Sequence, residues 1–219
     1  MSMTAKTSIA VVDYGMGNLR SVVKALEHVA PDSKVVLTTD AADIIDADRI
    51  VFPGQGAARD CMAHLHDRGL IGPVTEAAQQ KPFLGICMGL QVLMQHSHEN
   101  GGIDCMGMFD GEVGYFGDHI DASRHELKIP HMGWNNVEQT VEHPLWQGIE
   151  QDSRFYFVHS YFVQPEDETI VSGKAQYGIP FVTSVASGKL FAVQFHPEKS
   201  ASDGLKLLSN FVSWNGETR

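Results

Sequence analysis

Short apolar runs alternate with segments of helical periodicity along the first half of the chain. The apolar runs are rich in β-branched residues, are bounded by Gly, Pro or Asp, and predict buried strands at 8–13, 34–38 and 49–52. Other segments repeat apolar side chains every three or four residues and predict helices at 19–30, 57–67 and 72–80. Because short connections join these alternating elements, we expect an α/β fold with a doubly wound, mostly parallel sheet of the flavodoxin type.

The pattern loosens after Ser97 and is mostly strand-like beyond residue 130. Turn signals separate two short strands of an antiparallel hairpin that we expect at one edge of the core, at 106–109 and 112–116. Later strands are predicted at 136–140, 154–159, 169–173, 179–186 and 190–195. A final helix is predicted at 201–214, with Ser200 or Ser202 as its cap and an apolar stripe of Leu205, Leu208, Phe211 and Val212. We expect residues 1–219 to form a single domain.

The composition is that of an ordinary globular protein, with 43% hydrophobic and 20% charged residues. A net charge of −11 without a basic cluster argues against nucleic acid or an anionic membrane surface as a partner. The sparse cysteines (Cys61, Cys87 and Cys105) suit free thiols in a reducing compartment. The N-terminal apolar run is too short for a signal peptide or a membrane span, so we expect a cytoplasmic protein.

The stretch 81–94 is the first candidate for chemistry, because it combines a short apolar strand with a glycine-bracketed turn and a predicted helix. Gly85, Cys87 and Gly89 have the Gly-x-nucleophile-x-Gly spacing, in which a strained strand-to-helix turn lifts one side chain out of the sheet. The positive end of a following helix would favour the thiolate, and the N–H of Met88 would face an oxyanion. By itself the motif also fits a small buried cysteine at a strand end.

The second candidate is the segment 194–198, Gln-Phe-His-Pro-Glu, which follows an apolar strand. Pro197 disfavours helix at His196, and in an extended segment His196 and Glu198 would point the same way. A carboxylate beside imidazole fixes its tautomer and stabilises the imidazolium that forms when it takes a thiol proton. The same residues are equally consistent with a surface turn that ends the strand.

Two pairs of histidines are weaker candidates for metal ligation: His64 with His66, and His96 with His98. Neither pair is joined by cysteines or carboxylates at a recognised metal-binding spacing, so solvated surface positions are the better interpretation. We therefore expect no metal site and no cofactor.

Taken together, the motifs resemble those of the class I, or triad, glutamine amidotransferases. The resemblance rests on Pro-Gly-Gln-Gly at 53–56, Gly-Ile-Cys-Met-Gly-Leu-Gln at 85–91 and Phe-His-Pro-Glu at 195–198, in the order and spacing of the family. Within this class the chain closely resembles the glutaminase subunits of imidazole glycerol phosphate synthase, of histidine biosynthesis. The additional segments that carry this resemblance are 13–21, 130–135, 157–161 and 199–200. One departure is Gln55 with Ala58, where that family commonly has Val and an aromatic or similar apolar residue.

The resemblance implies a catalytic triad of Cys87, His196 and Glu198 that releases ammonia from the side-chain amide of glutamine. It implies that the oxyanion is held by backbone groups of Gln55, Gly56 and Met88. The implied substrate-binding residues are Gln91, which is also one helical turn beyond the cysteine, and Ser160 and Tyr161.

The resemblance also implies a heterodimer with a (β/α)-barrel cyclase, which uses the ammonia to form imidazole glycerol phosphate and aminoimidazole carboxamide ribotide. Candidate interface residues are Asn18, Arg20, Met132, Trp134 and Lys199. Trp134 suits a buried structural position equally well. For the isolated subunit we expect low glutaminase activity that rises when the cyclase binds its ligand.

Three alternatives compete with this hypothesis. The first is another amidotransferase subunit, such as that of anthranilate synthase or of the vitamin B6 pathway, against which the segments 13–21 and 130–135 argue. The second is a free-standing cysteine hydrolase of γ-glutamyl amides, which would need no partner. The third is an inactive regulatory module, against which the complete set of Cys87, His196 and Glu198 argues.

Overall fold

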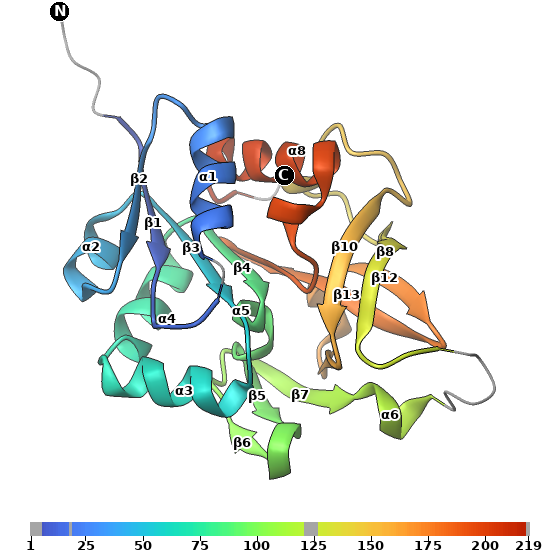
Figure 1. Ribbon diagram of the computed structural model, residues 1–219. Coiled ribbons are helices and arrows are strands. Elements are labelled where there is room, and N and C mark those ends of the chain that lie inside the picture. Colours follow the sequence, from blue (N-terminus) through green and yellow to red (C-terminus); the bar gives the residue numbers. More distant parts are fainter. Residues whose placement is uncertain (1–5, 18, 121–126, 218–219) are drawn as a thin grey trace, which may run out of the picture.

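A central sheet of eight strands organises the computed structural model, which describes residues 6–17, 19–120 and 127–217 (Figure 1). In spatial order its strands are β2 (Lys34–Thr38), β1 (Ser8–Val12), β3 (Arg49–Gly54), β4 (Phe83–Cys87), β14 (Leu190–Val193), β13 (Ile179–Ser187), β12 (Val171–Tyr177) and β9 (Glu138–Gln139). Neighbouring strands from β2 to β14 pair in parallel, whereas the pairs β14–β13, β13–β12 and β12–β9 are antiparallel. The predicted α/β fold, with a mostly parallel doubly wound sheet and added antiparallel strands, is confirmed.

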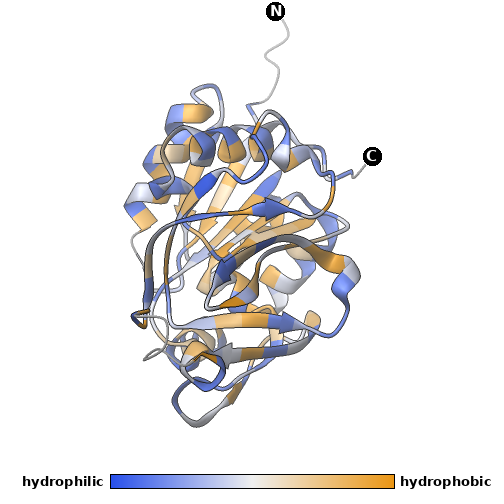
Figure 2. Ribbon diagram, turned by 90° about the vertical axis from the view of Figure 1, so that its right-hand side faces the viewer, coloured by the Kyte–Doolittle hydropathy of each residue, from blue (hydrophilic) through white to orange (hydrophobic). Residues whose placement is uncertain are grey.

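Helices cover both faces of this sheet because successive side chains of a strand point to opposite sides. Ile9 and Val11 of β1 pack on the side of α1 (Leu19–Val29) and α8 (Ala201–Ser213). Ala10 and Val12 pack on the side of the helices α2 (Ala41–Asp46), α3 (Ala58–Asp67) and α4 (Ile71–Gln80). Hydrophobic residues prevail along the central strands, whereas hydrophilic residues gather on the surrounding helices and loops (Figure 2).

Two smaller sheets flank the central one. One has four strands in the order β11 (Tyr161–Pro165), β7 (Phe109–Tyr115), β5 (Met94–Ser97) and β6 (Ile103–Asp104), and the other pairs β10 (Arg154–His159) with β8 (His131–Asn136). The hairpin predicted at 106–109 and 112–116 is wrong, because β7 is one continuous strand. Gly111 lies within it at φ 120°, and a side chain there would overlap the backbone of Gln164 on β11. Glycine therefore marks a close approach between strands here, not a turn.

Several other predictions from the sequence need correction. The six-residue helix α2 was not predicted, although Asp40 caps it by accepting a hydrogen bond from the N–H of Ala42 at 2.8 Å. The strand expected at 136–140 is present only as the short β9, and the longer strand β8 precedes it because that segment pairs with β10. The strands β5 and β11 were not predicted, and β12 and β14 differ from their predicted boundaries by a few residues.

The apolar stripe of α8 is also shifted from the predicted one. Leu208 and Phe211 are buried as predicted, Leu205 and Val212 are partly buried and pack against the core, and Gly204 and Leu207 are further buried positions. The helix approaches Pro197 so closely that a side chain at position 204 would overlap the Pro197 carbonyl group, and this contact sets the inward face.

The remaining elements are single turns: α5 (Met88–Gln91), α6 (Phe116–His119) and the 3₁₀ turns η1 (Glu99–Gly101), η2 (Pro144–Trp146), η3 (Glu168–Ile170) and η4 (Pro197–Lys199). None of the helices in the described ranges is both long enough and apolar enough to cross a membrane.

Candidate active site

Cys87 stands at a sharp turn between β4 and α5, at the carboxyl end of the parallel strands. Its backbone is at φ 55° and ψ −108°, a conformation that L-residues rarely adopt. Gly89 permits the turn, because any side chain at this position would overlap the carbonyl oxygen of Phe52 on the neighbouring strand β3. The predicted strand-to-helix presentation of the cysteine is therefore present. The helix is shorter than predicted, since α5 ends at Gln91, and a single turn contributes little macrodipole.

His196 and Glu198 follow strand β14, and their buried side chains lie at ion-pair distance. Nδ1 of His196 lies 2.8 Å from Oε1 of Glu198, and each side chain is only 2% exposed. His196 has extended backbone, as predicted, and its N–H donates to the carbonyl oxygen of Tyr156 on β10 at 2.9 Å. Pro197 begins the turn η4, so Glu198 reaches the imidazole from a 3₁₀ turn and not from the extended segment that we predicted. Glu198 thus orients the imidazole ring, and the backbone bond to Tyr156 holds His196 in place.

The electrostatic environment of His196 favours its protonated form. Burial lowers the pKa of His196, but interaction with the Cys87 thiolate and with Glu198 outweighs burial and raises this pKa to about 10. Nε2 of the imidazole is buried and has no hydrogen-bond partner of ordinary geometry within the described ranges. The arrangement can therefore hold a protonated imidazole beside Cys87 and transfer one proton through Nε2.

A pocket of about 430 Å³ opens onto this pair of residues. Cys87 and His196 line it together with every residue that we predicted for the oxyanion and the substrate, namely Gln55, Gly56, Met88, Gln91, Ser160 and Tyr161. The N–H of Met88 is in the first turn of α5, where backbone donors have no acceptor within the helix. Glu198 lies behind the imidazole and does not line the pocket.

Buried amide side chains complete the wall beside the cysteine. Nε2 of Gln91 donates to the carbonyl oxygen of Tyr161 at 3.1 Å and to Oε1 of Gln194 at 3.0 Å, while Oε1 of Gln91 has no partner in the described part of the chain. Nε2 of Gln194 lies 3.7 Å from Sγ of Cys87 and donates toward it. An amide donor of this kind stabilises a thiolate.

The sequence model of the family described as Glutamine amidotransferase class-I matches residues 10–214. The chain belongs to the class I glutamine amidotransferases. This amidotransferase is 54% identical over 209 residues to "Imidazole glycerol phosphate synthase subunit HisH" of Pseudomonas putida, with 95% of this chain and 98% of the relative covered. It is 59% identical over 209 residues to the protein of the same name from Thiobacillus denitrificans, with 94% and 91% covered. The resemblance to this subfamily is thereby confirmed.

A solved structure described as a glutamine amidotransferase shares the fold of this class I amidotransferase. The two superpose with a TM-score of 0.68 at 18% sequence identity, with 93% of this chain and 97% of the other covered. At this identity the likeness concerns the fold alone.

Glu99 is a residue of the amidotransferase pocket that the sequence did not indicate. It belongs to η1, its Oε2 accepts a hydrogen bond from the N–H of Ala58 at 2.7 Å, and burial raises the pKa of its carboxyl group. It lines the pocket together with Tyr161. No motif surrounds Glu99, because its place in the pocket depends on how η1 packs against α3.

Of the candidate interface residues of the amidotransferase, those in the described ranges are exposed, and Lys199 also lines the pocket. Met132 and Trp134 on β8 are 62% and 44% exposed, so the alternative of a buried structural Trp134 is wrong. Lys199 lies with Nζ 5.9 Å from the ring centre of Tyr156, which in turn lies beside Trp134. Arg20 is exposed on α1, and Asn18 lies outside the described residues.

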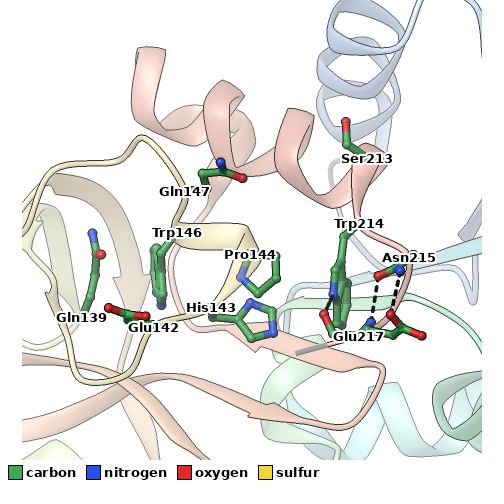
Figure 3. Close-up of a pocket in the computed structure, with 10 residues that line it drawn as sticks. All are labelled: Gln139, Glu142, His143, Pro144, Trp146, Gln147, Ser213, Trp214, Asn215 and Glu217. Atoms are coloured by element: carbon green, nitrogen blue, oxygen red, sulfur yellow. Dashed lines mark hydrogen bonds between the residues drawn. The ribbon is translucent and has the colours of Figure 1, made fainter. Parts of the chain in front are cut away.

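A larger pocket, of about 540 Å³, lies between η2 and the end of α8, and it contains none of the predicted site residues (Figure 3). Some of its polar groups are hydrogen-bonded: Nδ1 of His143 accepts from the N–H of Leu145, and Nε1 of Trp214 donates to the carbonyl oxygen of Glu217. The buried Nε2 of His143 has no partner among the described residues. Across the described ranges, no group of three or more His, Cys, Asp or Glu side chains is arranged to hold a metal ion.

Proposed function

We propose that this chain hydrolyses glutamine to glutamate and ammonia, with Cys87 as nucleophile, His196 as base and acid, and Glu198 as the group that orients the imidazole. One observation carries this assignment: His196 is held by Glu198 at Nδ1, while its unpartnered Nε2 and the thiol of Cys87 belong to the same pocket. This is the nucleophile, base and orienting-group arrangement of covalent acyl transfer.

The thiolate of Cys87 attacks the carbonyl carbon of the glutamine side chain, and a C–S bond forms. The tetrahedral oxyanion is stabilised by the N–H of Met88 and by backbone N–H groups of Gln55 and Gly56, each such donor being worth about 3 kcal/mol. As the C–N bond breaks, His196 gives its proton from Nε2 to the departing ammonia. Water then attacks the thioester with His196 as base, which releases glutamate and regenerates the thiolate.

The charged end of the substrate glutamine is assigned to polar groups that line the same pocket as Cys87. The unpartnered Oε1 of Gln91 and the carboxylate of Glu99 are acceptors that suit an α-ammonium group. Ser160 and Tyr161 line the same pocket, and their backbone groups are assigned to the α-carboxylate.

The ammonia passes, in this proposal, to a (β/α)-barrel cyclase that docks as the other half of a heterodimer and forms imidazole glycerol phosphate and aminoimidazole carboxamide ribotide. The docking surface would contain Met132 and Trp134, whose exposure suits an apolar contact, together with Asn18, Arg20 and Lys199. Low activity of the isolated subunit, rising when the cyclase binds its ligand, belongs to the same proposal. We also propose that residues 1–219 act as one domain and that the protein works in the cytoplasm, which its free cysteines suit.

The test is an assay of the subunit together with its cyclase, comparing wild type with Cys87→Ala. The variant is expected to lose glutamine-dependent product formation and to retain product formation from external ammonium salts. Retained glutamine hydrolysis in Cys87→Ala would overturn the assignment of the nucleophile.

A further inference from the structure

A continuous hydrogen-bond network runs from Cys87 toward the surface strand β8. Its inner part consists of the bonds already described: Gln194 donates toward Sγ of Cys87, and Gln91 donates to both Gln194 and the carbonyl oxygen of Tyr161. Gln194 is fully buried and Gln91 is 2% exposed. The carbonyl oxygen of Tyr161 only accepts, so the NH₂ group of Gln91 must face it. Oε1 of Gln194 then accepts from the same NH₂ group, which turns the NH₂ group of Gln194 toward Cys87.

The outer part of the network consists of two buried histidines and an asparagine. Nδ1 of His159 lies 2.7 Å from the carbonyl oxygen of Tyr161, and Nε2 of His159 lies 2.9 Å from Nδ1 of His131. Nε2 of His131 lies 3.4 Å from Nδ2 of Asn135 on the same strand. We call Asn135, His131, His159, Gln91 and Gln194 the histidine–amide network.

The hydrogen bonds fix the tautomers of both histidines. A carbonyl oxygen only accepts, so Nδ1 of His159 carries the hydrogen and its Nε2 is an acceptor. His131 must then donate from Nδ1, which leaves its Nε2 to accept from Asn135. Burial lowers the pKa of His131 to about 4 and that of His159 to about 3, so both rings are neutral near pH 7. The network thus has one consistent direction of donation from Asn135 to Tyr161.

Strand β8 presents its two faces to different surroundings. Met132 and Trp134 are exposed, whereas the alternating residue His131 is 3% exposed and faces inward with Asn135 half-buried beside it. The residues that begin the network therefore alternate along one strand with the exposed Met132 and Trp134.

We propose that His131 and His159 are positioning residues for Cys87, and that they connect the outer face of β8 to the nucleophile. They act by holding the carbonyl group of Tyr161 against Gln91, which in turn fixes the amide of Gln194 beside the thiol. The inference rests on the proposed function, since it takes Cys87 as the nucleophile and the outer face of β8 as the docking surface.

The test uses two substitutions that separate hydrogen bonding from packing. The ring of His131 packs on Phe157 and Tyr177, with ring centres 4.9 and 4.0 Å away. His131→Phe keeps an aromatic ring but removes the Nδ1–H donor, whereas His131→Asn loses the ring but keeps an N–H donor near the same place. The complex with the partner subunit is assayed for glutamine hydrolysis, and Cys87 alkylation by iodoacetamide is followed by peptide mass spectrometry, which separates it from Cys61 and Cys105.

The expected results for the two variants differ in activity. His131→Phe is expected to lower kcat/KM for glutamine about tenfold and to slow Cys87 alkylation, and it also lowers the thermal midpoint, because the buried Nε2 of His159 loses its donor. His131→Asn is expected to lower the midpoint while keeping kcat/KM within about threefold of wild type. Wild-type rates of hydrolysis and alkylation in His131→Phe would overturn the inference. Because alkylation does not require glutamine to be the substrate, this outcome is distinguishable from failure of the proposed function, which Cys87→Ala reveals.

Discussion

Nδ1 of His196 lies 2.8 Å from Oε1 of Glu198, and only Pro197 separates the two residues in sequence. Both side chains are almost fully buried, and the second carboxylate oxygen of Glu198 has no partner among the described residues. Among the described residues, the carboxylate thus makes its hydrogen bond to the imidazole, which it orients and whose positive charge it stabilises.

Replacing Glu198 by glutamine tests this relationship. Glu198→Gln keeps the shape of the side chain but removes its charge and allows the wrong tautomer of His196, so kcat for glutamine hydrolysis is expected to fall on the order of 10²-fold or more. Steady-state glutaminase assays of the complex measure the effect. Product formation from external ammonium salts serves as the control and should not change. Wild-type kcat in the variant would mean that Glu198 has no orienting role.

Glycine at the nucleophile turn is required by packing. Gly89→Ala would place a methyl group against the carbonyl oxygen of Phe52, so we expect a loss of at least about 3 kcal/mol in the free energy of unfolding, or failure to fold. The matched control is Gly72→Ala in helix α4, where nothing lies within 4 Å of the added methyl group. This variant is expected to gain about 0.5 kcal/mol. Urea denaturation measures both changes, and equal stabilities would contradict the prediction.

His143 is expected to make stability depend on pH. Burial lowers its pKa to about 4 from an ordinary value of 6.5, so the unfolded chain takes up a proton between these values while the folded chain does not. Stability is therefore lost as the pH falls from 6.5 to 4, and this residue contributes about 1.4 kcal/mol per pH unit within that range.

The variant that tests this prediction is His143→Asn, which can still accept the hydrogen bond from the N–H of Leu145 but does not titrate. Loss of the ring contacts with Phe191 and Trp214 should lower stability equally at every pH. The slope of the free energy of unfolding against pH should become shallower by about 1.4 kcal/mol per pH unit, the contribution of one proton. His131 and His159 still contribute to the remaining slope. An unchanged slope in denaturation curves at pH 4–7 would show that His143 does not titrate as expected.

Trp134 is expected to contribute to affinity for the partner subunit. Trp134→Ala should weaken binding by about 2 kcal/mol without changing the fold, since exposed aromatic residues on a docking surface are common energetic anchors. Leu37 provides a matched control, because it is 42% exposed but lies on β2, at the far edge of the central sheet. Leu37→Ala should leave the affinity unchanged. Calorimetric titration with the partner subunit measures both, and equal affinities for the two variants would remove Trp134 from the interface.

Local sequence patterns predicted the main sheet well because their physical causes are local. The apolar runs at 8–13 and 49–52 are strands, and the periodic segment at 57–67 is a helix, since alternation and 3.6-residue spacing directly reflect burial on one or two faces. Failures occurred where partners distant in the chain decide the conformation. Met94–Ser97 is a strand because it pairs with β6 and β7, and β11 is a strand because it pairs with β7.

The sequence by itself determined the fold class, because apolar runs alternate with segments of helical periodicity. It also indicated the three side chains that we propose for the triad, because glycine spacing around Cys87 and proline beside His196 restrict the backbone within a few residues. Only the tertiary structure decided that Glu99 enters the pocket, that Gln194 approaches Cys87 from 107 positions away, and that His131 bonds to His159. Such contacts depend on strand register and helix packing, which bring distant residues together without leaving a pattern between neighbours in the chain.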